Sequence, residues 1–157
     1  MTSDIEVYLG LGSNIGDKKA NIDKALLLLE ERGVRIVILS DMIETEPWGF
    51  STDSKFINCV VRAEVSESVT PIRLLGMCKD IECQMGRSDK PEYDAEGRRI
   101  YHSRLIDIDI LLYGTQDFDY EDLVIPHPLM SARDFVMIPL RQVASQRVKE
   151  AFKEIFI

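Results

Sequence analysis

The sequence has few cysteines, no long apolar run and no excess of basic residues. Its 157 residues include three cysteines, Cys59, Cys78 and Cys83, and their spacing is not that of a metal-binding motif. This usage predicts reduced thiols in the cytoplasm rather than a disulfide framework. No apolar run approaches the roughly 20 residues of a membrane span. Residues 1–6 place no basic stretch ahead of an apolar one, so we also expect no secretory signal.

The charge balance is acidic. Lysine and arginine total 19 and aspartate and glutamate total 27, which gives a net charge of −8. This surplus argues against nucleic acid or an anionic membrane as a general partner. It is compatible with a small anionic ligand, because a few local arginines can hold one. The length and the absence of repeats or linkers predict a single domain over residues 1–157.

Hydrophobic periodicity and turn residues predict a ferredoxin-like α+β fold of order β-α-β-β-α-β with a C-terminal extension. The predicted strands are 5–12, 34–45, 56–65 and 105–113. The predicted helices are 17–32, with Asp17 as its N-cap, and 71–85, with Thr70 as its N-cap and Gly86 after its end. A short hairpin is predicted at 115–125 and a last helix at 131–144. This order places both main helices on one face of an antiparallel sheet. The other face is left for the extension or for a site, and the tail from Ser145 carries no informative pattern.

Two aspartates are the central functional feature. Asp107 and Asp109 are two residues apart on a predicted strand, so both point to one face, with Cα atoms roughly 6.5–7 Å apart. Two carboxylates among isoleucines repel each other and resist desolvation, and cations relieve both effects. The spacing suits Mg²⁺, which also binds substrate phosphates, and two ions about 3.5–4 Å apart fit between them. The simpler alternative is a pair of solvated aspartates on an edge strand.

The segment 87–104 is polar, rich in arginine and too long for a simple connection. Its arginines are Arg87, Arg98, Arg99 and Arg104. Beside a carboxylate–metal site they suit phosphate binding, and otherwise they belong to an ordinary solvated loop. We expect this segment to act as a lid that is mobile without ligand and ordered when a bound phosphate group supplies charge for its arginines.

His127 lies between two prolines, which stiffen the backbone and restrict where the imidazole points. Arg133 and Phe135 follow within eight residues. A rigidly placed histidine near an arginine favours a functional role, while a purely structural histidine is the equal alternative.

Phe56 and Asn58 share one face of the predicted strand 56–65. An aromatic ring and a carboxamide side by side suit a flat heterocycle, since one stacks and the other hydrogen-bonds. The alternative is a surface pair on a half-exposed strand. The L-G-L-G-S-N stretch at 9–14 lacks the lysine of a P-loop and the glycine spacing of a dinucleotide site. We interpret it as a tight turn between strand and helix, with Gly10 and Gly12 present for close packing.

Six short motifs between about residue 7 and residue 144 occur in the same order as in a known enzyme family. They are L-G-S-N at 11–14, T-x-P-x-G at 45–49, F-I-N at 56–58, E-x-x-x-G-R at 82–87, R-x-x-D-I-D-I-L at 104–111 and P-H-P-x-x-x-x-R-x-F-V-x-x-P-L at 126–140. Together they resemble the 6-hydroxymethyl-7,8-dihydropterin pyrophosphokinases of folate biosynthesis. The resemblance implies a ferredoxin-like fold, two Mg²⁺ ions and transfer of pyrophosphate from ATP to the pterin hydroxymethyl oxygen, with release of AMP.

The resemblance also implies roles for individual residues. Asp107 and Asp109 would bind the metal and, with Arg87 and Arg104, form the catalytic set. The implied ATP-binding residues are Glu82, Arg87, Arg104, His127 and Arg133. The implied pterin-binding residues are Thr45, Trp48, Phe56, Asn58 and Phe135. The expected partners are ATP and the pterin, without nucleic acid or membrane, for a monomer in the cytoplasm.

Two other function classes compete with this interpretation. A nucleotidyltransferase also combines a Gly-Ser turn with a D-x-D pair, but there the two motifs lie close together, whereas Ser13 and Asp107 are separated by most of the domain. A non-catalytic ferredoxin-like binding module has no need of paired aspartates beside arginines. Release of AMP, release of pyrophosphate, or no product distinguishes the three.

Overall fold

A computed structural model describes residues 4–45, 55–86, 92–93, 95–97, 99–100 and 105–156. Its main sheet comprises β1 (Asp4–Ser13), β2 (Arg35–Leu39), β3 (Ile43–Thr45), β4 (Phe56–Ser66) and β7 (Asp107–Tyr113). Two small hairpins are β5 (Glu92–Tyr93) with β6 (Arg99–Ile100), and β8 (Phe118–Tyr120) with β9 (Leu123–Ile125). The helices are α1 (Lys18–Glu31), α2 (Pro71–Gln84), the 3₁₀ turn η1 (Met130–Ala132), α3 (Asp134–Val143) and α4 (Gln146–Ala151).

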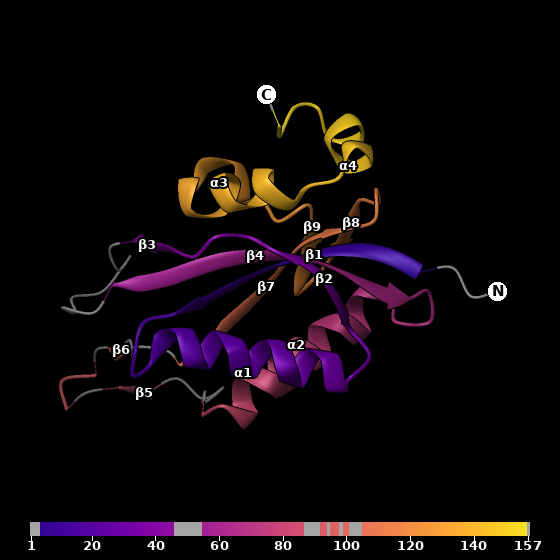
Figure 1. The fold of residues 1–157 in the computed structure, drawn as a ribbon. Helices are drawn as coiled ribbons and strands as arrows, with labels where there is room; N and C mark the ends of the chain where they lie inside the picture. Colours follow the sequence, from indigo (N-terminus) through magenta and orange to yellow (C-terminus); the bar gives the residue numbers. More distant parts are fainter. Residues whose placement is uncertain are drawn as a thin grey trace.

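The main sheet is antiparallel and lies between two helical layers (Figure 1). Its strand order is β2-β4-β1-β7, and β3 continues along β4 beyond the end of β2. Helices α1 and α2 cover one face, and α3 and α4 cover the other (Figure 1). The predicted class, an antiparallel sheet with both main helices on one face, is confirmed, and β3 and the β5–β6 hairpin add to the predicted elements.

Side-chain capping sets the start of both main helices where the sequence predicts it. The Asp17 side chain accepts a hydrogen bond from the Ala20 N–H at 3.1 Å, and the Thr70 hydroxyl accepts one from the Arg73 N–H at 3.2 Å. Each satisfies a backbone donor that has no partner within its helix. Gly33, with φ +94°, follows the end of α1 in the left-handed region that favours glycine.

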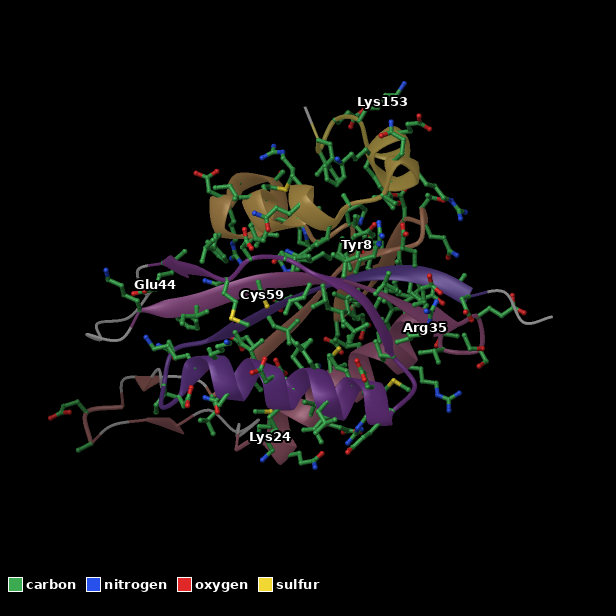
Figure 2. The ribbon with its side chains drawn as sticks, viewed as in Figure 1. Tyr8, Lys24, Arg35, Glu44, Cys59 and Lys153 are labelled. Atoms are coloured by element: carbon green, nitrogen blue, oxygen red, sulfur yellow. The ribbon has the colours of Figure 1, made fainter. Side chains whose placement is uncertain are left out.

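Two hydrophobic clusters pack against opposite faces of the sheet. The residues of β4 alternate as predicted, because Cys59 and Val61 lie in the cluster under α1 and α2, while Val60 lies in the cluster under α3. Figure 2 shows the same division, with Tyr8 directed towards the α3–α4 layer and Cys59 towards the α1–α2 layer. Both residues are almost completely buried.

The predicted strand 34–45 is wrong in its continuity, because it divides into β2 and β3 at Ser40. The Ser40 N–H donates to the Val60 carbonyl at 2.9 Å, while its hydroxyl accepts from the Val60 N–H at 2.8 Å. A side-chain oxygen therefore takes the place of a backbone acceptor, and the regular ladder stops there. The Asp41 N–H then donates to the Gln142 side chain at 2.8 Å, so α3 holds the link between the two strands.

The C-terminal part differs from the prediction in two ways. The predicted helix 131–144 divides into η1 and α3, and the tail beyond it forms α4, with Val148 fully buried. Phe152, Ile155 and Phe156 pack on the cluster that contains Tyr8. The tail folds because its apolar side chains cover a part of the sheet that α3 does not reach. The predicted hairpin at 115–125 is confirmed as β8–β9.

The junction between α3 and α4 is fastened to β1 and β4. The Ser145 N–H donates to the Tyr8 hydroxyl at 2.9 Å, and the Ser145 hydroxyl donates to the Glu6 carboxylate at 2.7 Å. The Arg62 guanidinium donates to the Val143 carbonyl, the last residue of α3, at 3.1 Å. These bonds satisfy the polar groups where α3 ends and fix that end against the sheet. Among the described residues, no helix is long and apolar enough to cross a bilayer.

Candidate active site

Asp107 and Asp109 lie on β7, on the face opposite the α1–α2 layer, as predicted. Asp107 is half-buried and Asp109 is exposed, while Ile108 between them is buried in the core on the other side. On β1 their partners are Gly12 and Gly10, so no side chain of that strand stands beside either carboxylate. On that side the side chains nearest to Gly12 come from β4, where Asn58 and Phe56 lie over the glycine.

The donor set of this pair fits Mg²⁺, which prefers carboxylate oxygens and keeps several waters or phosphate oxygens. Within the described ranges, no group of three or more histidine, cysteine, aspartate or glutamate side chains is arranged to hold a metal ion. A cation at Asp107 and Asp109 would thus complete its shell from water or from substrate phosphates.

Asn58 lies across β1 from Asp107, because Gly12 pairs with Asn58 on β4 and with Asp107 on β7. Its carboxamide Nδ2 donates to the Thr45 hydroxyl at 2.8 Å, which fixes the orientation of the amide. Asn58 is buried, and Phe56 and Thr45 are half-buried beside it. The structure brings together three of the predicted pterin-binding residues at the end of the sheet that carries the aspartates.

Gly12 is a site residue that the sequence interpretation placed wrongly. Gly10 and Gly12 lie within β1 and not in a turn, since the strand continues to Ser13. A Cβ at position 12 would lie 2.7 Å from Asn58 Oδ1 and 3.6 Å from the Phe56 ring, so Asn58 could not keep its position beside a larger residue. The predicted close packing at this glycine agrees with the contact, because glycine inside a strand often marks a close approach by another group. The group that approaches lies on a neighbouring strand, so the sequence does not identify it.

His127 follows β9 and is tied to β7 by its backbone N–H, which donates to the Leu111 carbonyl at 3.1 Å. The Leu129 N–H donates to His127 Nδ1 at 3.3 Å, so the proton of the neutral ring is assigned to Nε2. Burial lowers the pKa of His127, the charge of Asp109 opposes this shift, and the charge of Arg133 adds to it. His127, Asp109 and Arg133 therefore lie within electrostatic reach of one another.

Arg133 and Phe135 lie at the start of α3. The Arg133 guanidinium carbon is 5.7 Å from the centre of the Phe135 ring, within the range of a cation–π contact. Phe135 also packs against the cluster under α3. The contact orients the guanidinium, and it places a cation beside the second aromatic ring of the predicted site.

A cavity of about 290 Å³ lies between α2, β7 and the β8–β9 hairpin. Its apolar wall comprises Leu75, Ile108, Ile110, Leu123 and Val124. Asp109 and His127 line it as well, as do Glu121 and Asp122 at the hairpin turn. About half of the lining is polar, and the cavity adjoins the aspartate pair through Asp109.

Glu82 lies on α2 and is buried, with 6% of its surface exposed. Its Oε2 accepts a hydrogen bond from the Ile108 N–H at 2.8 Å, directly between the two aspartates in sequence. Burial raises the pKa of the neighbouring Cys78 thiol, and the charges of Glu82 and Asp109 raise it further. This side of β7 is thus buried and negatively charged.

Three of the predicted site residues, Trp48, Arg87 and Arg104, lie outside the described residues. The same holds for most of the segment 87–104, of which the structure describes the short β5–β6 hairpin and its turn at 95–97. Their predicted roles, and the predicted lid, stay predictions.

An antiparallel α+β fold with a carboxylate pair, a carboxamide–aromatic group and an adjoining cavity is typical of domains that bind small molecules. A family model, 7,8-dihydro-6-hydroxymethylpterin-pyrophosphokinase, matches residues 8–145. The chain belongs to this family, as the resemblance of its motifs predicts.

Relatives in bacteria and plants agree with this assignment. The chain is 41% identical over 139 residues to the 2-amino-4-hydroxy-6-hydroxymethyldihydropteridine pyrophosphokinase of Porphyromonas gingivalis, covering 88% of this chain and 90% of that protein. Identity to the Bacillus subtilis protein of the same name is 34% over 145 residues, with 92% and 81% covered. The mitochondrial folate synthesis bifunctional protein of Pisum sativum is 39% identical over 139 residues, with 88% of this chain and 25% of that protein covered.

Solved structures share the fold. A crystal structure of HPPK-DHPS in complex with substrates matches 99% of this chain and 43% of its own length, with a TM-score of 0.65 and 15% identity. The Plasmodium falciparum HPPK-DHPS with pteroate matches 98% of this chain and 43% of its own, with a TM-score of 0.66 and 15% identity. The chain therefore spans less than half of these solved chains, and at such low identity the likeness concerns the fold alone.

Proposed function

We propose that this chain is an ATP-dependent pyrophosphokinase of folate biosynthesis, which transfers pyrophosphate from ATP to 6-hydroxymethyl-7,8-dihydropterin. The pterin hydroxymethyl oxygen attacks the β-phosphorus of ATP, the bond from that phosphorus to the α,β-bridging oxygen breaks, and AMP leaves. The hydroxyl proton passes to solvent. The observation that supports this proposal is the row Asn58–Gly12–Asp107, in which a carboxamide and a carboxylate lie on one face of the sheet, one strand apart on either side of Gly12.

The spacing of this row suits the reaction. Neighbouring strands lie about 4.7–4.9 Å apart, so Asn58 and Asp107, two strands apart, are separated by roughly 9–10 Å at their backbones. A flat ring hydrogen-bonded at Asn58 can therefore direct a hydroxymethyl group towards Asp107. Holding both reactants in this geometry makes a bimolecular reaction effectively unimolecular.

The pterin end comprises Phe56 and Phe135, which stack on the ring, and Asn58, which reads its polar edge. Thr45 holds the Asn58 carboxamide in one orientation through the 2.8 Å hydrogen bond. A site with a fixed amide discriminates against ligands that cannot pair with it, because the buried amide would be left unsatisfied. Trp48 is assigned to the same end of the site because it lies within the T-x-P-x-G motif of the family.

At the nucleotide end, Asp107 and Asp109 would hold two Mg²⁺ ions, which neutralise phosphate charge when bound. His127, neutral because its pKa is lowered, offers its Nε2–H to a phosphate oxygen. Arg87, Arg104 and Arg133 supply positive charge to the phosphates. Phosphoryl transfer of this kind needs positioning and charge stabilisation, and no covalent nucleophile of the protein.

The remaining part of the ATP site is assigned to the cavity beside Asp109. Its apolar wall suits the adenine ring, and the position of Asp109 and His127 on the same cavity directs the phosphates towards β7. Glu82 lies on this nucleotide side of the strand, where the resemblance places it.

We further propose that the enzyme acts as a single-domain monomer in the cytoplasm. In support, the family match covers residues 8–145 as one continuous stretch. Cys59, Cys78 and Cys83 form no disulfide, which fits a reducing compartment.

A product assay tests the proposal. Purified protein is incubated with ATP, Mg²⁺ and the hydroxymethyl dihydropterin, and we expect AMP and pyrophosphorylated pterin in equal amounts. Asp107→Asn and Asp109→Asn should lower turnover by at least about a hundredfold, because the phosphate charge is no longer neutralised. Asp119→Asn, at an exposed position of β8, is the matched control and should retain wild-type turnover. Formation of ADP in place of AMP, or wild-type turnover in both site variants, would refute the assignment.

A further inference from the structure

Glu82 carries a carboxylate that is buried on the far side of β7 from the two aspartates. Only 6% of its surface is exposed, and its Oε2 accepts the Ile108 N–H at 2.8 Å. Burying a carboxylate is costly unless strong hydrogen bonds compensate it. A bond from a backbone N–H to an ionised carboxylate is of the stronger, charge-assisted kind.

The Ile108 N–H belongs to the peptide bond that joins Asp107 to Ile108. Strand β7 is the last strand in the order of the main sheet, with β1 as its neighbour there. Successive N–H groups of a strand point to opposite edges. Since the Ile108 N–H points to Glu82, those of Asp107 and Asp109 face β1, where Gly12 and Gly10 are their partners. The backbone between the aspartates is therefore held from both edges.

We propose that Glu82 is a positioning residue for the aspartate pair. Its carboxylate holds the outer edge of β7, so that Asp107 and Asp109 present their oxygens at a fixed spacing to a divalent cation. This inference rests on the metal assignment in the proposed function and deepens it, because it gives Glu82 a role through the strand rather than through ATP. A hydrogen-bonding partner of this kind commonly changes metal affinity by about 10- to 100-fold when it is removed.

The test compares two substitutions at position 82. Glu82→Gln keeps an oxygen acceptor of the same reach, whereas Glu82→Leu removes the acceptor at similar volume. Mn²⁺ is titrated into each variant in the presence of a non-hydrolysable ATP analogue, and free Mn²⁺ is measured by electron paramagnetic resonance. We expect Glu82→Leu to raise the Mn²⁺ dissociation constant by about 10- to 100-fold, and Glu82→Gln to stay within about threefold of wild type. Binding of the pterin alone should change by less than about twofold in both.

A control variant separates positioning from general loss of stability. Leu74 is a fully buried residue of α2 without a part in the proposed site, so Leu74→Ala should lower the melting temperature and leave Mn²⁺ affinity unchanged. If Glu82→Leu does not fold, Glu82→Asp takes its place, because it keeps the charge but is too short to reach the Ile108 N–H. We expect Glu82→Asp to weaken Mn²⁺ binding as Glu82→Leu does.

The outcomes are distinguishable. If Asp107→Asn weakens Mn²⁺ binding but Glu82→Leu and Glu82→Asp bind Mn²⁺ as wild type does, the positioning role is refuted and the metal assignment stands. An equal loss of Mn²⁺ affinity in Leu74→Ala refutes it too, since the effect would then follow stability. If Asp107→Asn leaves Mn²⁺ binding unchanged, the metal assignment fails and the role of Glu82 fails with it.

Discussion

Replacing Gly12 by alanine should damage the pterin end of the site while leaving the nucleotide end intact. The added Cβ would lie 2.7 Å from Asn58 Oδ1, a distance that carbon and oxygen atoms do not adopt without bonding. Asn58 must therefore move, and it is buried and bonded to Thr45 at 2.8 Å. The collision is directed at the one side chain that reads the polar edge of the pterin.

The size of the effect on stability and on pterin binding follows from the contacts that Asn58 loses when it moves. Overpacking of a buried site costs about 1–3 kcal/mol of folding stability, and loss of the hydrogen bond to Thr45 lies within that range. For binding, a carboxamide turned away from the ligand forfeits about 1–2 kcal/mol, which corresponds to roughly a 5- to 30-fold weaker pterin dissociation constant. The proposed contacts of Mg²⁺ and ATP lie on the β7 side, so both ligands should bind as before.

Gly10→Ala provides the matched control, because its Cβ would meet only the Leu111 side chain at 3.6 Å, an ordinary contact. Calorimetric titration with pterin, in the presence of Mg²⁺ and a non-hydrolysable ATP analogue, measures both variants, and thermal unfolding gives their stability. We expect near wild-type pterin binding for Gly10→Ala and the loss stated above for Gly12→Ala. The reasoning is refuted if Gly12→Ala binds pterin within twofold of wild type, or if both variants lose the same affinity.

Two further predictions concern Thr45 and Cys59. Thr45→Val should weaken pterin binding about three- to tenfold, because it releases the Asn58 amide, and should leave ATP binding unchanged. Thr45→Ser, which keeps the hydroxyl, should recover wild-type pterin binding. Equal loss of affinity for both ligands in calorimetry would contradict this prediction. Burial, and secondarily the charge of Asp23, raises the pKa of Cys59 from 9.0 to about 12, so the folded protein keeps a proton that the unfolded chain loses above pH 9. Between pH 9 and about 12, this thiol should therefore lower the free energy of unfolding by about 1.4 kcal/mol for each unit of increase in pH. Cys59→Ala should have a pH dependence shallower by that amount in urea unfolding, and parallel curves would show the thiol to be uninvolved.

The parts of the fold that follow from local chemistry could be predicted from the sequence. Asp17 and Thr70 start their helices by bonding to backbone groups three residues away, and this depends on nearest neighbours only. The common face of Asp107 and Asp109 follows from the period of a strand, whatever surrounds it. These features were placed correctly because the interaction and its signal lie in the same stretch of sequence.

The features that could not be predicted depend on groups distant along the chain. The break at Ser40 requires the Val60 N–H, and the requirement for glycine at position 12 comes from Asn58 on the neighbouring strand. The fold of the tail depends on an apolar area around Tyr8 that exists only after the sheet has formed. The local structural propensities of the residues do not predict these features, because the features arise from tertiary contacts.

Because α3 is held at its C-terminal end, a small tilt of the helix moves the residues at its N-terminal end most. Its ten residues span about 15 Å, with Val143 held by Arg62 at one end and Phe135 near the other. A tilt of only about 4° about the fastened end displaces Phe135 by roughly 1 Å, and a misplacement of that size in a reacting complex can cost about a hundredfold in rate. The alignment of the aromatic ring over its substrate is thus set partly by the Ser145–Tyr8 contact at the opposite end of the helix.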